Sequence, residues 1–158
     1  MVEEGGKAPD FELKSDAGET VKLSQFRGRP VVLYFYPRDD TPGCTKEACA
    51  FRDSYDEYLA RDAVILGVSR DGEESHQKFK QKYDLPFTLL SDPDHAVTDA
   101  WGAWGAKTSH GRTTIGVIRS SFLVDEQGRI EEAWYRVRAE DTVPNVLGLG
   151  PGVDRTSP

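Results

Sequence analysis

The sequence predicts an α/β domain, with a central mixed β-sheet covered by helices on its faces. Two short apolar runs rich in β-branched and aromatic residues, 31–36 and 63–69, are typical of strands buried on both faces of a sheet. Amphipathic helical patterns separate the early strands, and a hairpin pattern follows late in the chain. The 158 residues contain no linker or repeat, so we expect one domain over 1–150 and a flexible tail over 151–158.

The first half of the chain can be divided by local patterns. Apolar and polar residues alternate on either side of the turn-like segment 15–18, which predicts an N-terminal β-hairpin. A helical turn is expected at 24–26, before the buried strand 31–36. A broad apolar stripe then predicts a helix from 43 to about 61.

In the second half of the chain, one segment has a strong helical periodicity and the other elements rest on weaker patterns. An amphipathic pattern with Phe79 and Tyr83 four residues apart predicts a helix. The elements expected after the strand 63–69 are a helix over 73–83, a strand over 87–90, a short helix ending near Trp101, a Gly- and Thr-rich loop over 102–115, a hairpin of 116–124 with 130–137, and a helical turn over 145–149.

Composition and charge exclude several classes of function. The net charge is −7 and no cluster of Lys and Arg is present, which argues against nucleic acid and anionic membranes as main partners. The first residues lack the basic and apolar regions of a secretory signal, and the apolar run 31–36 is too short to span a bilayer. The sequence therefore predicts a cytoplasmic protein.

The chain contains two cysteines, Cys44 and Cys49, which are too few for a disulfide scaffold in a protein of this size. In a reducing cytosol such a close pair is redox-active, metal-binding or inert. A metal site is disfavoured because the C-x4-C spacing has no second Cys pair and the three histidines lack ligand spacing. We expect no metal and no cofactor.

The segment around Cys44 carries the strongest chemical signal. A buried strand leads into a Pro42-Gly43 turn, which places Cys44 in the first turn of a helix. There the unpaired N–H groups and the positive end of the helix dipole favour thiolate over thiol, and cysteine pKa values fall to about 3.5–7.5 in such places. Gly43 allows a small oxidant to approach the backbone, Thr41 offers a hydroxyl beside the sulfur, and Pro37 can form a wall of the pocket.

The pattern Pro37-x-x-x-Thr41-x-x-Cys44 resembles the active-site motif of the peroxiredoxins. The longer stretch FYPRDDTPGCTKEACAFRD is similar to the bacterioferritin comigratory protein, or peroxiredoxin Q, subfamily. Further similarity runs through APDFEL, VILGVSRD, FTLLSDPD and IRSSFLVDEQGRI, so it covers nearly the whole chain.

This resemblance implies a thioredoxin-like fold and the reduction of hydrogen peroxide and organic hydroperoxides without metal or haem. It makes Cys44 the peroxidatic cysteine and Cys49 the resolving one, joined in an intramolecular disulfide that thioredoxin or a similar dithiol reduces. Thr41 and Arg119, in IRSSF, match the residues that activate the peroxide. The subfamily favours a monomer. The C-terminal segment departs from the pattern, since EDTVP stands where a histidine is common.

Each of these residues also has an ordinary structural interpretation. Cys44 and Cys49 could be core packing, Arg119 a solvated strand residue, and Thr41 a helix N-cap. Glu47 is expected to support the helix start or to pair with Lys46 or Arg119.

Other conspicuous side chains are predicted to be structural. Trp101 and Trp104 are expected to pack against the sheet rather than line a peroxide pocket. The three histidines and the turn 38–40 are expected at the surface.

Two other functions remain open at this stage. One is a thiol–disulfide oxidoreductase, which the missing C-x-x-C motif disfavours. The other is a non-catalytic thioredoxin-fold binding or chaperone module that keeps the cysteines for packing. Catalytic consumption of hydroperoxide distinguishes a peroxidase from both.

Overall fold

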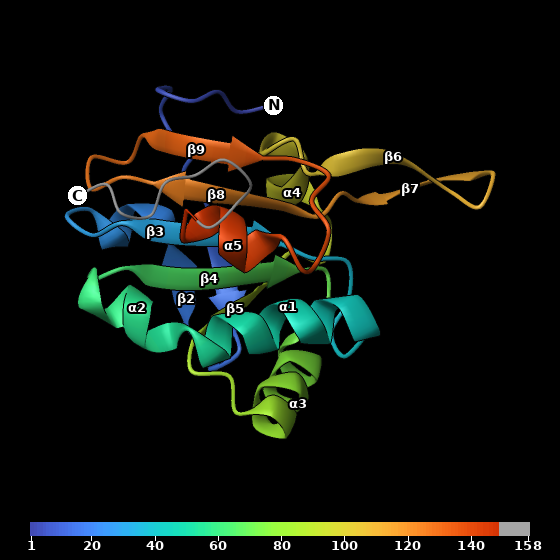
Figure 1. Cartoon of the computed structure of the whole chain (residues 1–158), viewed down its shortest axis with the longest axis horizontal. Coiled ribbons are helices and arrows are strands. Elements are labelled where there is room, and N and C mark those ends of the chain that lie inside the picture. Colours follow the sequence, from blue (N-terminus) through green and yellow to red (C-terminus); the bar gives the residue numbers. More distant parts are fainter. Residues whose placement is uncertain (149–158) are drawn as a thin grey trace.

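The computed structural model describes residues 1–148. Seven strands form one sheet in the order β2-β1-β5-β4-β3-β8-β9, and β6 pairs with β7 in a separate hairpin (Figure 1). The strands are β1 (Glu12–Ser15), β2 (Thr20–Lys22), β3 (Val31–Phe35), β4 (Val64–Ser69), β5 (Thr88–Ser91), β6 (Trp104–Ser109), β7 (Arg112–Val117), β8 (Ser120–Val124) and β9 (Ile130–Trp134). The helices are η1 (Leu23–Phe26), α1 (Pro42–Asp53), α2 (Tyr55–Ala60), α3 (Glu73–Tyr83), α4 (Ala96–Ala100) and α5 (Thr142–Val146).

The centre of the sheet is parallel and its flanks are antiparallel. Strands β3, β4 and β5 run parallel, because α1 with α2 and then α3 carry the chain back between them. Strand β8 pairs antiparallel with β3, and β1 pairs antiparallel with β5. The expected mixed sheet with helices on its faces is confirmed, as are the N-terminal hairpin and the helix over 73–83.

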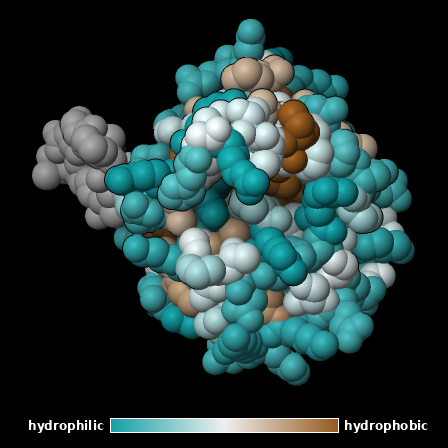
Figure 2. All heavy atoms as spheres, turned by 90° about the vertical axis from the view of Figure 1, so that its right-hand side faces the viewer, coloured by the Kyte–Doolittle hydropathy of each residue, from teal (hydrophilic) through white to brown (hydrophobic). Residues whose placement is uncertain are grey.

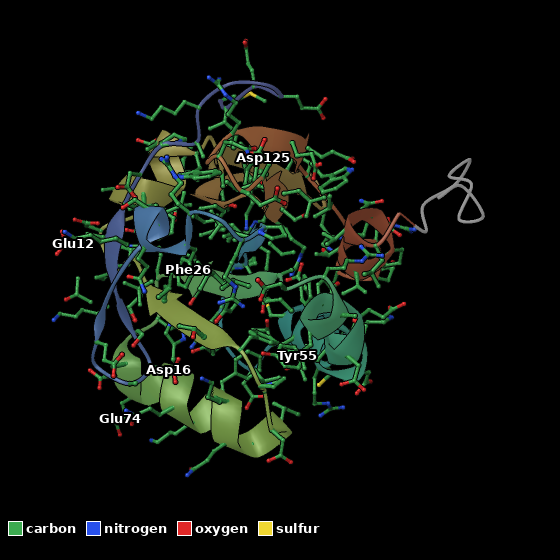
Figure 3. The ribbon with its side chains drawn as sticks, turned by 90° about the vertical axis from the view of Figure 1, so that its left-hand side faces the viewer. Glu12, Asp16, Phe26, Tyr55, Glu74 and Asp125 are labelled. Atoms are coloured by element: carbon green, nitrogen blue, oxygen red, sulfur yellow. The ribbon has the colours of Figure 1, made fainter. Side chains whose placement is uncertain are left out.

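Strand β3 divides the hydrophobic core into two. Alternate side chains point to opposite faces of a strand, so Val31, Leu33 and Phe35 pack into one cluster, which also contains Trp101 and Phe122. The residues between them face a second cluster, which contains Cys44, Phe51 and Val143 and lies beneath α1, α2 and α5. Figure 3 shows Tyr55 of α2 and Phe26 of η1 on opposite sides of the sheet.

The prediction of a single helix over 43–61 is wrong, because two helices cover this segment. Helix α1 ends at Asp53 and α2 begins at Tyr55. Between them, the Ser54 hydroxyl donates a hydrogen bond to the Ala50 carbonyl at 2.8 Å, and serine back-bonding of this kind bends helices.

The predicted loop over 102–115 is also wrong, since most of it forms the β6–β7 hairpin. The two-residue turn consists of His110 and Gly111, both with positive φ, which is the backbone that a tight hairpin turn requires. The hairpin extends away from the body of the protein (Figure 1). As a consequence the predicted strand 116–124 is divided, and Arg119 lies in the break between β7 and β8.

The last helical element begins earlier than the predicted turn at 145–149. Helix α5 starts at Thr142, because Pro144 is tolerated in a first turn, where N–H groups have no intrahelical partner. The predicted tail 151–158 lies outside the described residues.

Two predictions about surface residues are wrong as well. His76 is fully buried, and Asp39 in the supposedly solvated turn 38–40 is 8% exposed. Trp101 is fully buried and Trp104 packs against the same core cluster, as expected. Within residues 1–148, no helix combines the length and apolar character needed to cross a membrane.

Candidate active site

Cys44 lies in the first turn of α1, at the end of the sheet where β3 stops. Pro42 and Gly43 are the first residues of the helix, and Thr41 occupies its N-cap position. The Cys44 side chain is only 1% exposed and belongs to the core cluster beneath the helix. Figure 2 views the molecule from the side where β3 ends and α1 begins in Figure 1; this face is mostly hydrophilic, with a strongly hydrophobic patch in its upper part and paler hydrophobic areas elsewhere.

Arg119 brings a positive charge to the sulfur. Its Nη2 donates to the Cys44 Sγ at 3.3 Å, while its Nη1 forms an ion pair with Glu47. The guanidinium passes close to the helix start, since a Cβ on Gly43 would lie 3.2 Å from Nη2 and 3.7 Å from the Ala139 Cβ. A glycine at this position therefore leaves the space through which Arg119 reaches the sulfur.

Glu47 completes this group one helical turn after Cys44. It is fully buried, and its second carboxylate oxygen accepts a hydrogen bond of 2.5 Å from the Thr142 hydroxyl of α5. Burial raises the pKa of Glu47 to about 7, against the opposing effects of the Arg119 charge and the Thr142 hydrogen bond. The carboxyl thus changes its protonation state near neutral pH.

Arg119 remains charged in this environment. Its partial burial works to lower the pKa of the guanidinium, but the Glu47 carboxylate and the Cys44 sulfur outweigh burial and raise it. One cation therefore faces two acids. When Glu47 holds a proton, the sulfur does not share the Arg119 charge with a carboxylate.

The other predicted pocket residues lie near this group, and none of them is hydrogen-bonded to the sulfur among the described residues. Thr41 is half-buried, and its hydroxyl donates to the Arg38 carbonyl at 3.0 Å rather than capping the helix. Pro37 is half-buried and Pro42 is exposed as the first residue of α1. Thr41 therefore occupies the N-cap position through its backbone, but its hydroxyl does not cap the helix.

Cys49 is not brought to Cys44. Both cysteines are free thiols, Cys49 is partly exposed, and the regular helix α1 holds them apart. Among residues 1–148, no group of three or more His, Cys, Asp or Glu side chains could hold a metal ion.

Thr142 was missed by the sequence analysis. It lies in EDTVP, the segment that departs from the subfamily pattern, and it brings α5 into contact with the carboxylate beside the site. No local signal marks it, because its partner is 95 residues away in the chain. The alternative that Glu47 pairs with Arg119 is confirmed, whereas its full burial was not foreseen.

Residues 5–133 match the model of the AhpC/TSA family. The chain belongs to this family. It is 51% identical over 146 residues to peroxiredoxin Bcp of Bacillus subtilis, covering 92% of this chain and 93% of that protein. It is 48% identical over 147 residues to a putative peroxiredoxin of Coxiella burnetii, covering 93% and 97%.

Solved structures agree with this assignment. The bacterioferritin comigratory protein of Xanthomonas campestris superimposes with a TM-score of 0.84 at 34% identity, covering 91% of this chain and 94% of that one. A peroxiredoxin Q variant from the same organism gives 0.81 at 36% identity, covering 86% and 87%. The predicted thioredoxin-like peroxiredoxin fold and the predicted subfamily are confirmed, and the relatives support a thiol peroxidase.

We expect the Arg119→Met protein to hold less thiolate at Cys44 near neutral pH, because the 3.3 Å contact with a cation is lost. Alkylation by iodoacetamide, followed in a Cys49→Ser background, should slow. Arg119→Lys should restore only part of the rate, since a lysine offers a point charge without the planar fork. An unchanged alkylation profile in Arg119→Met would show that Arg119 has no influence on the sulfur.

Proposed function

We propose that this protein reduces hydrogen peroxide and organic hydroperoxides through the thiolate of Cys44. The sulfur attacks one oxygen of the peroxide, an S–O bond forms, and the O–O bond breaks. The departing oxygen takes up a proton and leaves as water or an alcohol, so that Cys44 becomes a sulfenic acid. The bacterioferritin comigratory protein with which the chain superimposes is described by its alkyl peroxide reduction activity, which supports organic hydroperoxides as substrates.

The contact between Arg119 and Cys44 carries this proposal. A guanidinium 3.3 Å from the sulfur favours the nucleophilic thiolate and provides N–H donors for the peroxide oxygens as charge develops on them. Thr41 and Gly43, at the open end of the helix, complete the surroundings that a small oxidant would enter. Loss of one such donor typically slows an enzyme on the order of 10²–10³-fold.

Cys49 is proposed as the resolving cysteine. Its thiol attacks the Cys44 sulfenic acid, an S–S bond forms and water leaves, which preserves the oxidation level. Thioredoxin or a similar cytoplasmic dithiol then restores both thiols by exchange. Because one chain holds both cysteines, the cycle requires no second copy, and we propose that the protein acts as a monomer.

The two cysteines should have separable roles. We expect Cys44→Ser to abolish peroxide consumption, because a serine hydroxyl is hardly ionised near neutral pH. Cys49→Ser should react once with peroxide and then remain as a sulfenic acid that dimedone traps. Stopped-flow peroxide consumption and mass spectrometry measure both outcomes. Full turnover by the Cys44→Ser protein would refute the proposal.

The disulfide requires α1 to unwind. Five residues of regular helix separate two Cα atoms by a rise of about 7.5 Å and a rotation of about 140°, which places them roughly 9 Å apart. A disulfide needs Cα atoms closer than about 7 Å and converging Cβ vectors. Helix α1 is regular from Pro42 to Asp53, so it cannot contain the Cys44–Cys49 bond as it stands.

Hydrogen exchange should detect this unwinding. Amides from about Thr45 to Arg52 are expected to lose protection in the disulfide form, because their helical hydrogen bonds break. Amides of β4 (Val64–Ser69), which contribute to the parallel centre of the sheet, serve as the internal control and should stay protected. Equal protection of α1 in both forms, in a sample with a verified Cys44–Cys49 bond, would contradict the mechanism.

Unwinding also moves Glu47, which lies between the two cysteines. In the helix burial raises the pKa of Glu47 to about 7, from an ordinary value of 4.5 that it would regain in water. Between these values the helical form holds a proton that the unwound form releases. Raising the pH through this window therefore destabilises the helical form relative to the unwound one.

We accordingly expect disulfide formation in the wild-type protein to become faster as the pH rises between about 4.5 and about 7. Glu47→Gln should lose this part of the pH dependence, because glutamine does not titrate. Glu131→Gln, at an exposed position of β9, is the matched control. Stopped-flow tryptophan fluorescence after oxidation measures the step, and an identical pH profile in Glu47→Gln and the wild type would exclude the Glu47 effect.

A further inference from the structure

A buried carboxylate lies five residues before Cys44, in the connection between β3 and α1. Three side chains are hydrogen-bonded to the Asp39 carboxyl group: the Tyr36 hydroxyl at 2.6 Å, His76 Nδ1 at 2.7 Å and the Ser75 hydroxyl at 2.8 Å. Two of these partners belong to α3, so Asp39 joins the segment before Cys44 to that helix.

His76 is hydrogen-bonded through both of its ring nitrogens. Its Nε2 lies 3.0 Å from the Leu90 carbonyl oxygen, which can only accept a hydrogen bond, so Nε2 carries a proton. Its Nδ1 lies 2.7 Å from the Asp39 carboxyl group, which the Tyr36 and Ser75 hydroxyls also contact. The side chains of His76 and Asp39 are 0% and 3% exposed, so the bond between them is buried.

The backbone on either side of Asp39 is also held. The Asp39 N–H donates to the Asp71 carboxylate at 2.8 Å. Asp40, the next residue, has a φ of 55°, in the left-handed region that side chains other than glycine seldom adopt. Its carboxylate accepts hydrogen bonds from the Tyr83 hydroxyl at 2.7 Å and the Lys82 ammonium at 2.8 Å, which hold this unfavourable turn from α3.

The position of the sulfur depends on these anchors. Only Thr41, Pro42 and Gly43 separate the anchored residues from Cys44. The partner of the Cys44 Sγ, Arg119 Nη2, comes from a distant part of the chain. Displacements of about 1 Å at reacting groups can lower rates on the order of 10²-fold.

We propose that His76 is a positioning residue for the reaction of Cys44, acting through its bond to Asp39. This inference rests on the proposed peroxidase function. The imidazole Nδ1 holds the Asp39 carboxyl group, Asp39 fixes the strained turn at Asp40, and the turn presents Cys44 to Arg119. If His76 only stabilised the fold, it would act through its Nε2, which links α3 to β5 at the Leu90 carbonyl.

Two substitutions separate these roles because each retains one donor. In His76→Asn the amide nitrogen lies near the place of Nδ1 and can still donate to Asp39. In His76→Gln it lies near the place of Nε2 and can still donate to the Leu90 carbonyl. We expect His76→Gln to slow peroxide attack on Cys44 on the order of ten- to a hundred-fold. His76→Asn should retain most of the wild-type rate.

A second pair of variants avoids disturbing the buried histidine. Tyr36→Phe removes one donor from Asp39 with little change in shape, and we expect a several-fold slower attack. Tyr34→Phe is its matched control, since this buried hydroxyl of the same strand has no hydrogen-bond partner among the described residues. Tyr34→Phe should leave the rate unchanged.

Single-turnover peroxide attack and iodoacetamide alkylation of Cys44 are both measured, with thermal unfolding to confirm that each variant is folded. Equal rates in His76→Gln, Tyr36→Phe and the wild type would overturn the inference while leaving the peroxidase intact. So would a slower rate in His76→Asn than in His76→Gln. If the wild type consumes no peroxide, the proposed function fails, and the alkylation rates alone then decide whether His76 positions the sulfur.

Discussion

One guanidinium serving two buried acids is the constraint on which the site depends. Arg119 contacts the Cys44 sulfur and the Glu47 carboxyl at the same time, and both of these side chains are buried. Burial raises the pKa of Glu47 to about 7, although the Arg119 charge acts to lower it. When the Glu47 carboxyl holds a proton, the sulfur does not share the Arg119 charge with a carboxylate.

The same arrangement links the chemistry to the stability of α1. Cys44 meets Arg119 in the formed helix, whereas the proposed disulfide with Cys49 requires the helix to open. Glu47 lies between the two cysteines and is bound by Arg119 and by Thr142 of α5, so opening the helix separates all of these groups together. In the proposed mechanism, contacts that stabilise the helical form therefore oppose the form in which the disulfide is made.

Much of this could be predicted from the sequence, because the strongest signals are local. The run 31–36, the Pro-Gly turn before Cys44 and the helical pattern over 73–83 predicted their elements within a residue or two. The β6–β7 hairpin was missed because Thr- and Gly-rich segments carry little hydrophobic alternation. The burial of Glu47, Asp39 and His76 was missed for a different reason. Polar side chains are expected at the surface unless paired, and their partners come from distant parts of the chain.

The division of the core by β3 limits what an opening of α1 would disturb. The cluster that contains Trp101 and Phe122 lies on the far face of the sheet and shares no residue with the cluster beneath α1. Loosening of α1 therefore exposes apolar surface on one face only, while the opposite layer and the strand ladders keep the chain folded. In the proposed cycle the sheet therefore separates the layer that α1 leaves from a layer that stays packed, and α1 can re-form against an intact sheet.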